Sequence, residues 1–139
     1  MLHRFDLRVY YEDTDLAGIV YYANYLKFIE RGRSEWVRGL GIDQVALKAE
    51  QGLVFAVRKV EADYLRPARF DDQLCVTTQC AGLGKSRIEM HQEVLRGETL
   101  LFRAKITLVC LLNSGRPGRV PLPLRAALPQ VPEMAGGVV

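Results

Sequence analysis

The spacing of apolar residues changes once along this chain, from a helical period before Gly52 to an alternating one after it. Between about residues 24 and 40, apolar side chains recur every three or four positions, which predicts one long amphipathic helix. From about residue 60 to residue 112 they recur at every second position, the period of half-buried strands. Because the helix and the strands occupy separate stretches of sequence, the pattern favours an α+β fold over a parallel α/β fold.

Four alternating runs follow the helix, and each has one apolar face. These faces begin at Val60, Leu74, Ile88 and Leu100. Pro67 ends the first run, and Arg96 with Gly97 predicts a hairpin turn before the last run. A further short strand is expected at about residues 4–11. The sequence therefore predicts an antiparallel sheet of about five strands beside one long helix.

Residues 1–139 are expected to form one domain, because this length suffices for a single hydrophobic core. Five of the six prolines fall between Pro117 and Pro132. The segment from about residue 114 is therefore expected to lie along the surface without extending the sheet. Residues 135–139 are expected to be disordered.

Features of the helix and of the last strand indicate how they pack. Gly32 lies in mid-helix, where it costs about 1 kcal/mol relative to alanine, so we expect the helix to approach another backbone closely there. Trp36 falls on the apolar stripe and is expected in the core. Leu101, Val109 and Leu111 place apolar groups on the nominal outer face of the last strand, which favours an oligomer.

Charge and composition narrow the classes of function. A formal net charge of +3 and an isoelectric point near 8.9 are too mild for a dedicated nucleic-acid binder and are compatible with an anionic small-molecule ligand. Three cysteines without a CxxC pair and two histidines without an HxH spacing give little support to a disulfide framework or a metal site. No apolar run approaches the roughly 20 residues of a membrane span, and no signal-peptide core opens the chain, so a cytoplasmic protein is expected.

The concentration of tyrosines near the N-terminus is the main anomaly of the sequence. Five of the six tyrosines lie between Tyr10 and Tyr25, in a stretch that also holds Glu12, Asp13 and Asp15. This stretch leads into the long helix, where unpaired backbone N–H groups and the helix dipole attract developing negative charge. A carboxylate beside such donors is sufficient machinery for cleaving an activated ester. Alternatively, Asp13 and Asp15 only cap or turn the loop, and the tyrosines pack beneath it.

Two stretches carry a resemblance to a known family. The run YEDTDLAGIVYYANY, residues 11–25, resembles the signature of hotdog-fold acyl-CoA thioesterases of the 4-hydroxybenzoyl-CoA thioesterase type, especially their Tol–Pal-associated branch. The stretch YLRPARFDD, residues 64–72, is similar to the second recurrent segment of that family. The resemblance spans about residues 4–113.

The resemblance implies a hotdog fold, in which a curved antiparallel sheet wraps a long central helix. It also implies that two protomers pair their sheets edge to edge with active sites at the interface, and that dimers assemble into tetramers. The catalytic aspartate of the family corresponds to Asp15, and the backbone N–H that polarises the thioester carbonyl corresponds to that of Tyr22. Many members of the Tol–Pal-associated branch carry a histidine at the position of Tyr22. Imidazole catalysis is therefore unavailable there, whereas a backbone N–H survives the replacement.

Coenzyme A carries a pyrophosphate and a 3′-phosphate, which a basic turn of this sequence can meet. Lys85, Ser86 and Arg87 offer cations, a hydroxyl and backbone donors between two predicted strands, and a comparable segment binds the nucleotide in the resembled family. A solvated basic hairpin explains the same residues equally well. Asp15 can attack the thioester carbonyl or activate a water, and Asp13 is expected to shape the loop.

The residues and the resemblance together predict an acyl-CoA thioesterase that hydrolyses a thioester to a free acid and coenzyme A. We expect a homodimer or homotetramer with no metal, no redox cofactor and no nucleic-acid partner. One alternative is a protein that binds acyl thioesters or an acyl-carrier protein and has only vestigial hydrolysis. Another is an enoyl-thioester hydratase, but neither His3 nor His91 lies near Asp15 in sequence. His91 is expected at the surface or an interface, and the three cysteines in the core or an interface.

Overall fold

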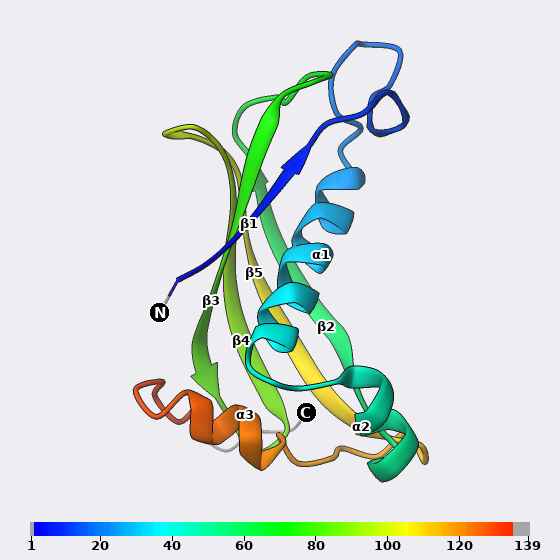
Figure 1. Cartoon of the computed structure of the whole chain (residues 1–139), viewed down its shortest axis with the longest axis vertical. Coiled ribbons are helices and arrows are strands. Elements are labelled where there is room, and N and C mark those ends of the chain that lie inside the picture. The colour runs from blue at the N-terminus through cyan, green and yellow to red at the C-terminus, as the bar shows by residue number, and fades with distance from the viewer. Residues whose placement is uncertain (1, 135–139) are drawn as a thin grey trace.

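A computed structural model describes residues 2–134. Figure 1 shows a curved sheet with one long helix, α1 (Asn24–Gly39), lying along its concave side. The strands are β1 (His3–Arg8), β2 (Leu53–Tyr64), β3 (Gln73–Leu83), β4 (Arg87–Arg96) and β5 (Thr99–Leu112). The other helical segments are the 3-10 turn η1 (Tyr11–Asp13), α2 (Gln44–Gln51) and α3 (Leu122–Ala127). Among the helices of this described part, none combines the length and the apolarity needed to cross a membrane.

The strands are antiparallel to their neighbours, in the order β1-β3-β4-β5-β2. The predicted α+β class, long helix and sheet of about five strands are thereby confirmed. β1 ends at Arg8 rather than near residue 11, because Tyr11–Asp13 wind into the turn η1. A tight turn joins β4 to β5, as predicted, and Gly97 occupies it with φ +60°.

Helix α2 was not expected from the apolar pattern. It has eight residues and buries only Leu47, so it carries almost no helical periodicity. Its ends are better marked: the Asp43 carboxylate accepts hydrogen bonds from the N–H groups of Val45 and Ala46, and Gly52 ends the helix with φ +64°. An aspartate cap and a left-handed glycine were therefore the available signals.

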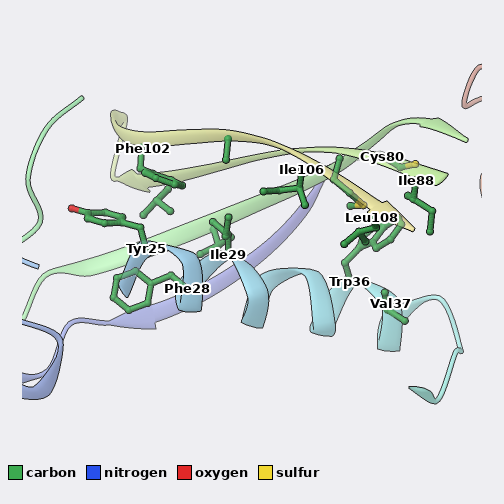
Figure 2. Packing of buried hydrophobic residues seen from close by; sticks show 14 of the residues in the cluster. Tyr25, Phe28, Ile29, Trp36, Val37, Cys80, Ile88, Phe102, Ile106 and Leu108 are labelled. Atoms are coloured by element: carbon green, nitrogen blue, oxygen red, sulfur yellow. The ribbon is translucent and has the colours of Figure 1, made fainter. Parts of the chain in front are cut away.

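The apolar face of α1 packs against the concave side of the sheet. Figure 2 shows buried side chains of this helix, among them Tyr25, Ile29 and Trp36, between the helix and the strands. Trp36 is 4% exposed, which confirms its expected place in the core. Each large apolar side chain buried in this way contributes about 1.5–3 kcal/mol. This row therefore fixes the helix on the sheet.

Gly32 lies where α1 packs closely against β3. A Cβ atom added at Gly32 would lie 2.6 Å from Cγ1 of Val76 and 3.3 Å from Oγ1 of Thr78. The close approach expected from the sequence is therefore present. The neighbouring groups are side chains of β3, however, and not another backbone.

Strand β2 leaves part of the concave face uncovered. Helix α1 packs mainly on β1, β3 and β4, whereas β2 lies at the edge of the sheet. Its register with β5 turns Val57, Val60 and Tyr64 toward the concave side, where they are 49%, 40% and 48% exposed. Within residues 2–134, β2 pairs only with β5. An unpaired edge with exposed apolar side chains is a surface to which another strand can add.

The outer face of β5 does not expose the apolar groups expected there. Leu101 and Val109 are 0% and 5% exposed within the protomer, and Leu111 is half-buried. Leu101 is the extra residue of a bulge opposite Val94 and Leu95, so strict alternation does not hold around it. The expected outward exposure of Leu101 and Val109 is therefore wrong, so these two side chains give no support to an oligomer.

The C-terminal segment is packed more deeply than expected. Figure 1 shows α3 lying across one end of the sheet. Val120, Leu124 and Leu128 are 3%, 0% and 8% exposed, because apolar residues between the prolines insert into the core. The expectation that this segment lies along the surface is therefore wrong. Within the described residues it forms isolated bridges with the sheet but no further strand, and residues 135–139 lie outside that range.

Candidate active site

Residues 13–21, between β1 and α1, fold into a small hairpin that we call the acidic hairpin. The N–H of Tyr21 donates to the carbonyl of Asp13 (2.9 Å), and the N–H of Asp15 donates to the carbonyl of Ile19 (3.0 Å). Gly18 closes the turn through its N–H to the Asp15 carbonyl, with a φ of +79° that favours glycine. These bonds fix the two aspartates relative to the start of α1.

Asp15 lies exposed at the beginning of the turn. Its Oδ1 accepts a hydrogen bond from the N–H of Ala17 at 2.9 Å, which is the turn-shaping contact that the alternative reading expected. Its Oδ2 has no hydrogen-bond partner among residues 2–134. One carboxylate oxygen therefore holds the turn while the other remains available to a substrate.

Asp13 has a different environment. Its Oδ2 accepts a hydrogen bond from the N–H of Tyr10 at 2.9 Å, and its carbonyl accepts from the Asn24 side chain at 2.9 Å. These contacts tie the acidic hairpin to the end of β1 on one side and to α1 on the other. The expected loop-shaping contacts of Asp13 are therefore present, whereas Glu12 is exposed.

The start of α1 is left open for a ligand. Its cap residue, Ala23, makes no side-chain hydrogen bond, and neither the N–H of Tyr22 nor that of Ala23 donates to an acceptor within the described part of the chain. Unpaired N–H groups at a helix N-terminus stabilise negative charge. The pKa of the Tyr21 hydroxyl is raised by the charge and hydrogen bonding of Tyr22, by partial burial and by the charge of Asp15. The Asp15 carboxylate thus lies close enough to the Tyr21 hydroxyl to act on it electrostatically.

A series of aromatic ring contacts runs from exposed tyrosines to a buried phenylalanine. Ring centroids are 4.9 Å apart for Tyr21 and Tyr22, 6.1 Å for Tyr22 and Tyr64, and 4.9 Å for Tyr64 and Phe102. Only Tyr25, at 3% exposure, is buried among the tyrosines of the N-terminal stretch. The alternative that all these tyrosines pack beneath the loop is therefore wrong, because the other four are exposed.

Lys85, Ser86 and Arg87 lie at the other end of the molecule. The loop after β1 adjoins the start of β3, where Arg8 pairs with Gln73, and the basic turn follows its end. The 11 residues of β3 span about 35 Å at ~3.3 Å per residue. Lys85 is exposed, Ser86 is 8% exposed and Arg87 is half-buried. A single protomer therefore does not bring these residues to Asp15 (Figure 1).

Other residues singled out in the sequence have structural surroundings. His91 is exposed on β4, Cys75 is half-buried, and Cys80 and Cys110 are buried. Burial raises the pKa of the Cys110 thiol to about 12, which leaves it protonated at neutral pH. The expectation that the cysteines are packing groups is thus confirmed for Cys80 and Cys110.

Two polar contacts were not predicted, one at the site and one farther along α1. The hydroxyl of Tyr64 donates to the carbonyl of Tyr22 at 3.0 Å. On α1, Arg33 donates to the side-chain oxygen of Gln92 at 3.0 Å, and burial lowers the pKa of its guanidinium. The stretch at residues 64–72 was the signal for the first contact, whereas a half-buried arginine inside an amphipathic helix has no sequence signature.

Comparison with known proteins places this geometry in context. Residues 17–102 match the thioesterase superfamily. The chain is 39% identical over 124 residues to an acyl-CoA thioesterase YbgC from Haemophilus influenzae, an alignment that covers 88% of this chain and 91% of that protein. It is 41% identical over 111 residues to an acyl-CoA thioester hydrolase YbgC from Escherichia coli, covering 79% and 82%.

A solved structure extends the similarity to the fold. The crystal structure of a probable thioesterase from Bartonella henselae superimposes with a TM-score of 0.84 at 40% identity. The superposition covers 87% of this chain and 100% of that one.

Proposed function

The chain belongs to the thioesterase superfamily, and on that premise we propose that Asp15 and the backbone N–H of Tyr22 form its catalytic centre. It is a hotdog-fold thioester hydrolase that converts an acyl-CoA to a free acid and coenzyme A. One observation carries the assignment of the centre. The unbonded Oδ2 of Asp15 lies in the acidic hairpin, and the unpaired N–H of Tyr22 follows directly after this hairpin, just before α1.

In the proposed reaction, the Tyr22 N–H donates a hydrogen bond to the thioester carbonyl and stabilises the negative charge that develops on its oxygen. The Asp15 carboxylate either attacks the carbonyl carbon or takes a proton from an attacking water. In the first route the C–S bond breaks, thiolate departs and water then hydrolyses the mixed anhydride, which restores Asp15. Because thiolate is a good leaving group, neither route needs a strong general acid.

We propose that the active unit is a homodimer joined along β2. The open edge and exposed apolar side chains of β2 support this pairing. In an antiparallel pair, the Tyr64 end of one β2 lies beside the Leu53 end of the other. Registers across β4, β5 and β2 place the basic turn at the Leu53 end. The partner's Lys85, Ser86 and Arg87 would then approach the acidic hairpin and bind coenzyme A phosphates.

The family resemblance further supports a homotetramer made of two such dimers. We also propose a cytoplasmic location, because the described cysteines are free thiols, as expected in a reducing compartment. We propose acyl-carrier-protein thioesters as an alternative class of substrate, because the same reaction would hydrolyse them. The acyl chain itself is to be identified by assay, since an apolar pocket distinguishes neighbouring acyl groups only weakly.

The release of free thiol from a panel of acyl-CoA and acyl-carrier-protein thioesters tests the proposal. Asp15→Asn is expected to lower kcat by about 10²–10⁴-fold, because it removes the nucleophile or base while retaining the turn contact to Ala17. Glu12→Gln is the matched control, since Glu12 is an exposed carboxylate in the same loop. Equal thiol release by wild type and Asp15→Asn would remove Asp15 from the mechanism. Tight binding without release by the wild type would identify a binding protein.

A further inference from the structure

We infer that residues 64–72, which we call the clamp, hold the acidic hairpin in its reactive geometry, and that Tyr64 is a positioning residue for the Tyr22 N–H. This inference rests on the proposed function, because it concerns the proposed carbonyl donor. The clamp is the second stretch that the sequence singled out, and the mechanism above gives it no role. It contacts the segment between β1 and α1, and hydrogen bonds also join it to β4, β5 and α1.

Backbone hydrogen bonds join the clamp to that segment. The N–H of Val20 donates to the carbonyl of Ala68 at 2.8 Å, and Ile19 forms an isolated bridge with Arg69. At the other end, the N–H of Val9 donates to the carbonyl of Asp72 at 3.0 Å. The clamp thus holds both ends of the loop that contains the acidic hairpin.

Side chains lock the clamp itself. The Oδ2 of Asp72 accepts hydrogen bonds from the N–H of Arg69 and from the Arg96 guanidinium, each at 2.8 Å. The N–H of Ala68, a residue with no exposed surface, donates to the hydroxyl of Tyr25 on α1 at 3.0 Å. The clamp is therefore a rigid support, because its shape is fixed from β4 and from the helix.

Tyr64 connects this support to the proposed donor. Its hydroxyl donates to the Tyr22 carbonyl at 3.0 Å. In the regular helical pattern the N–H of Leu26 would occupy that carbonyl, but it donates to the carbonyl of Ala23 instead, at 3.2 Å. The phenol thus replaces the missing helical partner. Ring contacts with Tyr25 at 5.5 Å and Phe102 at 4.9 Å fix the position of the phenol.

The two peptide planes around Tyr22 are consequently both held. The carbonyl of Tyr21, in the plane that carries the Tyr22 N–H, accepts a hydrogen bond from the N–H of Asn24 at 2.8 Å. The following plane is held by Tyr64. With both planes fixed, the direction of the Tyr22 N–H is set before a substrate arrives. Such preorganisation is what makes a single donor effective in polarising a carbonyl.

Tyr64→Phe tests the inference, because it removes the hydroxyl and keeps the ring. We expect kcat for acyl-CoA hydrolysis to fall about tenfold while KM changes less than about twofold, since the donor is misdirected and the binding surface is retained. Tyr11→Phe is the matched control. Its ring stacks on Phe70 of the clamp at 4.3 Å, and its hydroxyl has no hydrogen-bond partner among residues 2–134.

A spectroscopic measurement distinguishes a positioning role of Tyr64 from a general loss of rigidity in the variant. A coenzyme A analogue with a ketone in place of the thioester cannot be cleaved, and its carbonyl stretch reports the hydrogen bond from the enzyme. In the wild type and Tyr11→Phe, Raman difference spectra should show the bound carbonyl shifted below its frequency in water. In Tyr64→Phe the band should move back toward the solution frequency.

The outcomes distinguish this inference from the function on which it rests. Unchanged kcat and a carbonyl band that stays at the wild-type frequency in Tyr64→Phe would overturn the role of Tyr64, even if Asp15→Asn is inactive. A rise in KM at unchanged kcat would also overturn it, because it would make Tyr64 a binding residue. Full activity of Asp15→Asn would instead overturn the proposed catalytic centre.

Discussion

In the proposed mechanism, Tyr22 acts through its backbone and not through its side chain. The residue is 62% exposed, and its N–H has no acceptor within residues 2–134. Family members with histidine at this position can therefore share the carbonyl donor with this chain. The sequence could identify the position through its resemblance, but it could not show that the neighbouring N–H groups are open.

Tyr22→Pro removes this donor without adding a bulky group, because proline has no N–H and is tolerated around the start of a helix. We expect kcat to fall about 10²–10³-fold, the usual loss for one oxyanion-type donor, whereas Tyr22→Ala should retain most of its activity. Circular dichroism and thermal unfolding of both variants check that α1 is intact. Equal kcat values for the two variants would exclude the backbone N–H as the donor.

Because of Cys110, the free energy of unfolding of the protein should depend on pH in the alkaline range. Burial raises the pKa of its thiol from an ordinary value of 9.0 to about 12 in the folded protein. Between these values the unfolded chain loses the proton and the folded one retains it, so the free energy of unfolding falls as pH rises. The fall from this one group approaches about 1.4 kcal/mol per pH unit.

Urea unfolding at several pH values between 8 and 11 measures this slope. Cys110→Ala should unfold more readily at pH 8, because it leaves a small cavity, but its stability should depend less on pH. Parallel pH dependences for the wild type and Cys110→Ala would contradict the assignment.

At the scale of the elements, strong periodicity was a better guide than local composition. Helix α1 and the long strands were predictable because each buries one face and so repeats its apolar residues regularly. Helix α2 buries only Leu47, and α3 buries only Leu124, so neither has a repeat to detect. The bulge at Leu101 escaped prediction for a related reason, since one inserted residue reverses the faces of an otherwise alternating strand.

Helix α3 provides a test of the corrected view of the C-terminal segment. Leu124 is 0% exposed, whereas Leu122, in the same helix, is 77% exposed. Leu124→Ala should therefore lower the free energy of unfolding by about 2–5 kcal/mol. Leu122→Ala, the control, should change it by less than about 0.5 kcal/mol. Chemical denaturation gives both values, and similar losses for the two variants would mean that α3 lies on the surface after all.

At the scale of the whole molecule, the position of the basic turn is the least predictable feature from sequence. Lys85 and Asp15 are both near predicted elements, yet a strand of 11 residues separates the ends at which they lie. Sequence spacing does not report such a separation. The proposed β2 pairing resolves it, since a two-fold axis exchanges the two ends of the sheet.

Because Asp15 and Lys85 lie at opposite ends of the protomer, two impaired variants should restore activity to each other when they form a dimer. Asp15→Asn and Lys85→Glu should each form poorly active homodimers at low acyl-CoA concentration. When the two are co-expressed, a heterodimer unites the intact Asp15 of one chain with the intact Lys85 of the other. Random assembly should then restore about a quarter of the wild-type rate through such complementation. A preparation no more active than its parents would mean that each chain carries its own complete site.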